Sequence, residues 1–220
     1  MSISRLLPVA AAALLAVGHP AHAQPAAANL DTLTASEPAR QICAGTLSSE
    51  QLVSAYIAQA KAKPNLNAFV TLDEDGALKA ARAADAARRK QGGGACKPLG
   101  GVPVAIKDNI QVKGLPATAG TPALKAFVPA SDAPVVAKLR GAGAVILGKT
   151  NMHELAFGVT GYNPAFQTGS EVGVRNAYDP SRVAGGSSSG NGAALGARMA
   201  PASLGTDTGG SVRIPCAFNG

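Results

Sequence analysis

The chain has 220 residues, enough for one domain with a sizeable hydrophobic core. Hydrophobic residues make up 46% and charged residues 15%, which excludes a disordered or densely charged protein. The formal net charge is +7, but the lysines and arginines are scattered and aromatic residues reach only 4%. These features argue against a nucleic-acid partner, which would need a basic stripe or a base-stacking surface.

The N-terminus has the pattern of a secretory signal peptide. Arg5 precedes an apolar run over residues 6–17, and Ala21-His22-Ala23 has the form of a cleavage site. The run is too short to span a bilayer; the alternative is a buried alanine-rich helix. We interpret residues 1–23 as a signal peptide and residues 24–46 as a leader or linker. We therefore expect a periplasmic or secreted bacterial protein with no membrane contact after cleavage.

Three cysteines follow this segment: Cys43, Cys96 and Cys216. They lack C-x-x-C spacing, so we expect no metal site. Two arrangements stay open in an exported protein: a Cys43–Cys96 disulfide with Cys216 free, or three unpaired thiols.

From residue 47 onward, helical and strand-like patterns alternate. Ser48 to Gln51 resembles a capping box, and the apolar residues after it fall on one helical face as far as Pro64. Strands are expected at 68–72, 102–106 and 144–147, and helices at 75–90, 134–140 and 193–199. No terminal element is expected before Gly220. The alternation predicts an α/β fold with an at least partly parallel sheet.

Two segments, 185–190 and 205–211, are rich in glycine and hydroxyl side chains. Such segments can turn several backbone N–H groups toward one concave site. A flexible linker is the alternative, disfavoured because an apolar helix lies between them. A phosphate-binding loop is disfavoured because no lysine follows Lys149.

The residues 186–190 also match G-x-S-x-G, the nucleophile elbow of α/β-hydrolases. However, His153 is the only histidine after the signal-like segment, and it precedes the serines. A Ser-His-Asp triad in that order is therefore not available within the chain, although a missing C-terminal part could supply a histidine. If a serine is the nucleophile, the base candidate that remains within the chain is a lysine. Lys107 and its rival Lys149 each end an apolar strand, where burial can keep an amine neutral. A surface position is the alternative for both.

At these residues the sequence resembles the amidase-signature hydrolases, over about Leu47 to Gly220. Residues 101–108 (GVPVAIKD) resemble the family's lysine strand, residues 185–190 (GGSSSG) its first serine loop, and residues 205–215 (GTDTGGSVRIP) its nucleophile loop. The resemblance implies a mixed, largely parallel sheet flanked by helices. Because family domains are considerably longer, we interpret residues 47–220 as the N-terminal portion of such a domain, C-terminally incomplete and inactive by itself.

The resemblance implies a Ser-Ser-Lys triad that needs no metal or cofactor. Ser211 would attack the amide carbonyl, and neutral Lys107 would receive the proton through Ser187. The peptide bond between Gly186 and Ser187 is implied to be cis. The expected oxyanion-hole donors are the backbone N–H groups of Thr208, Gly209, Gly210 and Ser211. The expected supporting side chains are those of Ser188, Asp207 and Arg213.

Two positions depart mildly from the family pattern: Ser189 and Asn191 stand where many members carry glycine and serine. Ala156 and Gly158 occupy the segment that lines the acyl pocket in relatives, and both are small. The sequence around them is closest in look to the arylacetamide branch, which includes indoleacetamide and mandelamide hydrolases. A small aryl or alkyl primary amide is therefore the expected substrate, and a homodimer is compatible with the sequence.

Two other functions compete with an exported amidase. An amidotransferase component of the A type, which works on aminoacyl-tRNA, shares the same signature, but a signal peptide argues against that cytoplasmic assembly. A non-catalytic remnant is the other alternative, which motifs alone do not separate from an enzyme because the triad is intact.

Overall fold

A computed structural model describes residues 30, 36–91, 96–167 and 172–220. The segment interpreted as a signal peptide, residues 1–23, lies outside the described residues. Within the described ranges, no helix combines the length and apolar character needed to cross a membrane.

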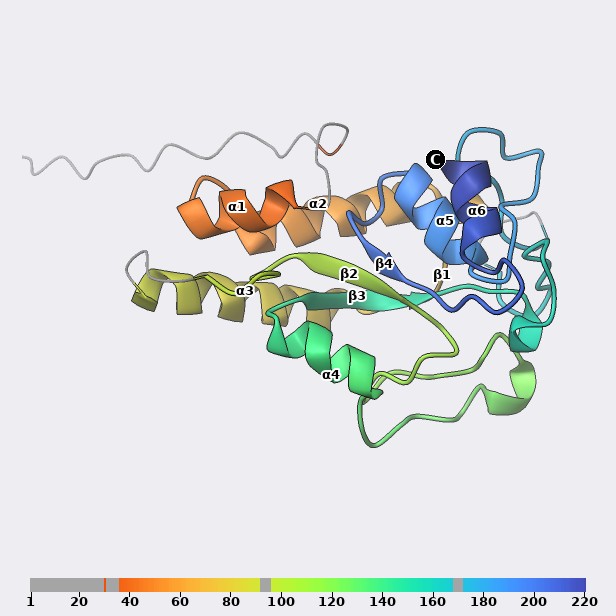
Figure 1. Ribbon diagram of the computed structural model, residues 1–220, viewed down its shortest axis with the longest axis horizontal. Helices are drawn as coiled ribbons and strands as arrows, with labels where there is room; N and C mark the ends of the chain where they lie inside the picture. Colours follow the sequence, from red (N-terminus) through yellow and green to blue (C-terminus); the bar gives the residue numbers. More distant parts are fainter. Residues whose placement is uncertain (1–29, 31–35, 92–95, 168–171) are drawn as a thin grey trace, which may run out of the picture.

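A four-stranded sheet forms the centre of the molecule (Figure 1). Its strands are β1 (Phe69–Leu72), β2 (Pro103–Lys107), β3 (Val145–Thr150) and β4 (Ser203–Leu204), in the order β1-β3-β2-β4. β1 runs antiparallel to β3, whereas β2 is parallel to both β3 and β4. Every residue of β2 and β3 is buried, as their almost continuous apolar sequences predict for strands covered on both faces. The expected mixed, largely parallel sheet is confirmed.

Helices cover both faces of this sheet (Figure 1). They are α1 (Glu37–Ala44), α2 (Ser49–Ala62), α3 (Glu74–Gln91), α4 (Pro134–Gly141), α5 (Ser189–Gly196) and α6 (Arg213–Asn219), with short 3-10 turns at Pro64–Leu66, Pro122–Leu124 and Glu154–Ala156. α1, α2, α3 and α5 contribute to one hydrophobic cluster together with Ala105 and Leu147 of the sheet. α4 contributes to a second cluster with Ile106 and Ile146, whose side chains point to the opposite face.

The capping box at Ser48 and Gln51 is confirmed at the start of α2. The other helices differ from the prediction in three places. α5 spans Ser189–Gly196 in place of the expected 193–199: it begins earlier, since the small residues of the serine loop continue directly into the helix, and it also ends earlier. A terminal helix, α6, is present where none was expected. α1 lies inside the expected linker 24–46, and it is held there because Ile42 is buried in the core.

A disulfide joins Cys43 of α1 to Cys96, and Cys216 is free and exposed. Of the two arrangements that the sequence left open, the structure has the first. The bond closes a loop with a sequence separation of 53 residues and ties α1 to the segment that leads into β2.

A bulge in β3 decides where two lysines point. The register between β2 and β3 shifts so that Ala105 pairs with Gly148 and Lys107 with Thr150. A Cβ at Gly148 would lie 2.2 Å from the carbonyl oxygen of Thr71, so only glycine fits there. Lys149 pairs with Ile106, and because successive side chains alternate between faces, Lys107 and Lys149 lie on opposite faces of the sheet.

Candidate active site

Lys107 lies at the end of β2, where its side chain is completely buried. Its Nζ lies 2.7 Å from Ser187 Oγ, 2.8 Å from Thr206 Oγ1 and 3.3 Å from the Thr206 carbonyl oxygen. All three partners are neutral oxygens. Burial therefore lowers the pKa of Lys107 to about 8, although the negative charge of Asp207 opposes this change. A large fraction of the lysine is neutral near pH 8, as a proton acceptor must be.

Ser187 lies just before α5 and is also fully buried. The peptide bond between Gly186 and Ser187 is cis, as the resemblance implied. The Ser187 carbonyl accepts a hydrogen bond from the His153 backbone N–H at 3.2 Å. The first serine loop is therefore held from both sides, by Lys107 at its hydroxyl and by the 153–158 segment at its backbone.

The nucleophile loop is folded around one carboxylate, that of Asp207. It accepts hydrogen bonds from the backbone N–H groups of Gly210, Val212 and Arg213 at 2.8, 3.1 and 3.1 Å. The Arg213 side chain donates two more, both at 3.0 Å. Arg213 is the main reason that the pKa of Asp207 lies well below its usual range. These contacts brace the nucleophile loop through Asp207 and Arg213, in the arrangement that was expected.

Ser188 connects the two serine loops. Its backbone N–H donates to the Ser211 carbonyl at 2.9 Å, and its Oγ donates to the Thr206 carbonyl at 3.2 Å. The two loops thus lie side by side, with Ser211 half-buried. Within this described cluster, however, no hydrogen bond joins Ser211 Oγ to Ser187 Oγ. The structure forms the Lys107–Ser187 half of the expected relay. Hydrogen bonds between catalytic groups, such as that expected between Ser211 and Ser187, often form only in the complex with substrate.

One of the four expected oxyanion-hole donors is not available in the structure. The Gly210 N–H is occupied by Asp207, so it does not point at a reacting carbonyl. In the described part of the chain, the N–H groups of Thr208, Gly209 and Ser211 have no hydrogen-bond partner. A Cβ added at Gly209 would meet open space, so the backbone there is accessible. Three donors remain for a developing oxyanion.

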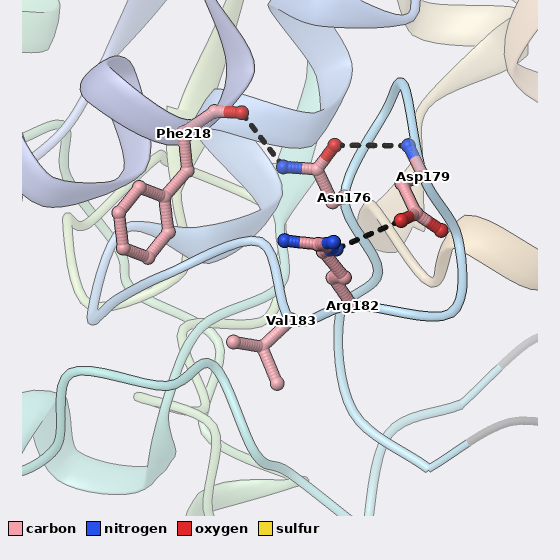
Figure 2. Close-up of a pocket in the computed structure, with 5 residues that line it drawn as sticks. All are labelled: Asn176, Asp179, Arg182, Val183 and Phe218. Carbon is pink, nitrogen blue, oxygen red and sulfur yellow. Dashed lines mark hydrogen bonds and ion pairs between the residues drawn. The ribbon is translucent and has the colours of Figure 1, made fainter.

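Two asparagines anchor α6, which follows the nucleophile loop directly. Asn219 donates to the Ala184 carbonyl at 2.8 Å, just before the first serine loop. Asn176 donates to the Phe218 carbonyl at 2.7 Å, a contact drawn in Figure 2. The second contact borders a cavity of about 550 Å³, lined by Asn176, Asp179, Arg182, Val183 and Phe218. None of the expected site residues lines this cavity, so we place the site at the lysine–serine cluster.

The segment expected to line the acyl pocket passes beside the first serine loop. A Cβ at Gly186 would lie 3.0 Å from the Gly158 carbonyl oxygen, and one at Gly158 would lie 2.2 Å from the His153 ring. Leu155 and Ala156 adopt positive φ angles of 50° and 58°. The structure therefore places Gly158 directly beside the first serine loop, with Ala156 two residues before it in the same segment.

Sequence reasoning missed two residues of the cluster, Thr206 and Asn109. Thr206 belongs to the nucleophile motif, but nothing in its spacing shows that its hydroxyl and carbonyl meet Lys107. Asn109 was missed for the same reason; its Nδ2 donates to Thr206 Oγ1 at 3.2 Å. Both contacts join segments almost 100 residues apart in the chain, so only the fold reveals them.

Three comparisons bear on this site. Over 188 residues the chain is 52% identical to a mandelamide hydrolase from Pseudomonas putida, a match that covers 86% of this chain and 37% of that protein. It is 47% identical over 188 residues to the A-type component of a glutamyl-tRNA(Gln) amidotransferase from Acidothermus cellulolyticus, covering 85% and 36%. The peptide amidase of Stenotrophomonas maltophilia superposes with a TM-score of 0.79 at 36% identity, covering 87% and 39%.

The chain spans well under half the length of each of these relatives. A protein-family model described as Amidase matches residues 51–220, a range that contains Lys107 and both serine loops. The order of the motifs and the fold agree with this match. The chain therefore belongs to the amidase family.

Proposed function

We propose that the protein hydrolyses a small primary amide of the arylacetamide type to a carboxylic acid and ammonia, through an acyl-enzyme on Ser211. The observation that carries the proposal is the 2.7 Å contact between Lys107 Nζ and Ser187 Oγ, beside the loop that presents Ser211. The choice of amide is supported by the small residues Ala156 and Gly158 and by the similarity to a mandelamide hydrolase.

The mechanism follows from the contacts of the lysine. In the neutral amine, two N–H groups can donate to Thr206 Oγ1 and to the Thr206 carbonyl, which leaves the lone pair directed at Ser187 Oγ. As Ser211 Oγ attacks the carbonyl carbon, its proton passes to Ser187 Oγ while the Ser187 proton passes to Lys107. The N–H groups of Thr208, Gly209 and Ser211 stabilise the oxyanion.

The second half of the reaction reverses the proton path. When the tetrahedral intermediate collapses, Lys107 returns its proton through Ser187 to the leaving nitrogen, and ammonia departs. Water then attacks the ester carbonyl of Ser211, its proton follows the same relay, and the carboxylic acid is released.

A fluorophosphonate probe applied to the complete enzyme, which the kinetic tests below also use, tests the nucleophile. Mass spectrometry of the labelled protein should locate the probe on Ser211, and Ser211→Ala should abolish labelling. Labelling at Ser188 would favour the α/β-hydrolase interpretation instead, and no labelling at all would favour a non-catalytic remnant. Ammonia release from mandelamide, phenylacetamide and indoleacetamide then identifies the substrate class.

The similarity to the A-type components of amidotransferases supports a second candidate, a protein that releases ammonia from an amide for use elsewhere. Glutamine is the discriminating substrate, since an arylacetamide hydrolase should prefer an aromatic acyl group over it. Export is a separate proposal, motivated by the pattern in residues 1–23. N-terminal sequencing of periplasmic protein should begin at Gln24; an intact Met1 on a cytoplasmic protein would contradict export.

A further inference from the structure

A buried ion pair lies next to the site, on the face of the sheet that Lys107 does not use. Lys149 and Asp108 are both fully buried, with 3.3 Å between Nζ and Oδ1. The same Nζ donates to the carbonyl oxygens of Asp108 at 3.2 Å and Pro116 at 3.0 Å. All three protons of the ammonium are therefore used, and Lys149 has none to offer to a reaction.

The other oxygen of the carboxylate holds a loop. Asp108 Oδ2 accepts hydrogen bonds from the Thr118 hydroxyl, from the Thr118 backbone N–H at 3.1 Å and from the Gly120 N–H at 3.2 Å. Together with the contact between Lys149 and Pro116, the pair fixes the loop that follows β2 at three places. This loop is buried there, with Thr118 only 1% exposed.

The fixed loop in turn holds the segment beside the first serine loop. The Ala119 carbonyl accepts a hydrogen bond from the Leu155 N–H at 2.8 Å, at the residue where the backbone turns to positive φ. The buried side chain of Asn163 donates to the carbonyls of Gly120 and Met152, both at 2.9 Å. A continuous path of hydrogen bonds therefore runs from the ion pair to the 155–158 segment.

We propose that the Asp108–Lys149 pair positions the acyl-binding wall, residues 155–158, and so sets which acyl groups the site accepts. The inference rests on the proposed amidase function. Asp108 follows Lys107 directly in the chain and reaches the wall through the hydrogen bonds to Thr118 and Gly120 and the Ala119 carbonyl. The pair touches neither Ser187 nor Ser211, and it acts on selectivity through the wall and not on the proton relay.

Stability alone does not account for this buried ion pair, because well-packed apolar residues of similar volume often stabilise a fold equally well. What an apolar pair would not supply is the set of three acceptor contacts to Thr118 and Gly120. These contacts fix the direction of the Ala119 carbonyl, and a wall displaced by about 1 Å is enough to change how a substrate is held.

Thr118→Val is the sharpest test, because it leaves both ions and the side-chain volume in place. It removes the hydroxyl that donates to Asp108 and that also accepts from the Gly120 N–H at 3.1 Å. Phenylacetamide and acetamide are compared as substrates. The variant should lower the ratio of their kcat/KM values about tenfold, the size expected for losing one hydrogen bond to a charged group. The loss should appear in KM for phenylacetamide, with kcat for acetamide little changed.

Two matched variants complete the experiment. Thr118→Ser keeps the hydroxyl and should retain the wild-type ratio. Thr121→Val makes the same substitution in the same loop at a threonine with no contact to Asp108, and it should also retain the ratio. An unchanged ratio in Thr118→Val, an equal change in Thr121→Val, or loss of folding in Thr118→Val would each overturn the positioning role.

The rate of Ser211 labelling by a small alkyl fluorophosphonate separates this inference from the proposed function. It should be equal in the wild type and in Thr118→Val, because the probe does not need the acyl-binding wall. Failure to label the wild type would contradict the proposed amidase itself. Normal labelling with an unchanged substrate ratio would contradict only the role of the ion pair.

Discussion

Lys107 and Lys149 are two lysines of the same sheet with opposite surroundings. Both lie at the ends of adjacent strands, and both side chains are fully buried. Lys107 meets only hydroxyl and carbonyl oxygens, whereas Lys149 meets the carboxylate of Asp108. Burial lowers the pKa of both, and in Lys149 the adjacent carboxylate opposes the change directly. Whether a buried lysine acts as a proton acceptor or as a structural cation therefore depends on the charge of its hydrogen-bond partners and not on how deeply it is buried.

The largest expected effect is on catalysis. Lys107→Met should lower kcat by about 10²–10⁴-fold, the usual contribution of a general base. It should leave the unfolding free energy little changed, since it removes a buried amine that has no carboxylate partner. Steady-state kinetics and urea unfolding measure both quantities. If Lys149→Met caused the catalytic loss instead, with Lys107→Met nearly fully active, the assignment of the base would be reversed.

The next effect is on stability. Lys149→Met leaves Asp108 buried without its ion partner and should lower the unfolding free energy by about 3–5 kcal/mol in urea titrations. Lys61→Met is the matched control, because Lys61 pairs with Glu74 at the surface, with side chains 59% and 40% exposed. That change should cost at most about 1 kcal/mol. Equal losses in the two variants would remove the distinction between the buried pair and a surface pair.

The disulfide gives a stability effect of intermediate size away from the site. Replacing Cys43 and Cys96 together by serine should lower the unfolding free energy by about 2–4 kcal/mol, because the unfolded chain is no longer closed over a separation of 53 residues. Labelling of Ser211 should not change. Cys216→Ser, at the exposed free thiol, should affect neither quantity. Loss of labelling in the double variant would show that the site depends on general stability, which would weaken both lysine predictions.

The smallest effect is a shift in the pH profile. The labelling rate of Ser211 should rise with pH and level off above about 8, because the neutral form of Lys107 is the active one. The negative charge of Asp207 raises the pKa of Lys107, so Asp207→Asn should move the rising limb to lower pH. Asp179→Asn, in an exposed pair with Arg182, is the control and should leave the limb in place. A limb that moves to higher pH in Asp207→Asn would contradict the electrostatic argument.

The sequence by itself determined the parts of this protein that depend on local patterns. The apolar runs that became β2 and β3 and the capping box of α2 could be read from residue types and spacing. The three motifs around Lys107, Ser187 and Ser211 were identified through their resemblance to the amidase-signature family. These features are local because strand burial, helix capping and glycine-rich loops leave their mark on neighbouring residues.

The residue patterns alone left Lys107 and Lys149 as rivals; the family resemblance favoured Lys107, and the tertiary structure gives the physical reason that it meets the serines. Both follow apolar strands and look equivalent in sequence, but the register at Gly148 and the alternation of side chains send them to opposite faces. The contacts of Lys107 with Thr206 and of Lys149 with Asp108 join segments 99 and 41 residues apart. No local pattern records such pairs, since the partner of a buried charge is set by how the strands pack and not by the sequence beside it.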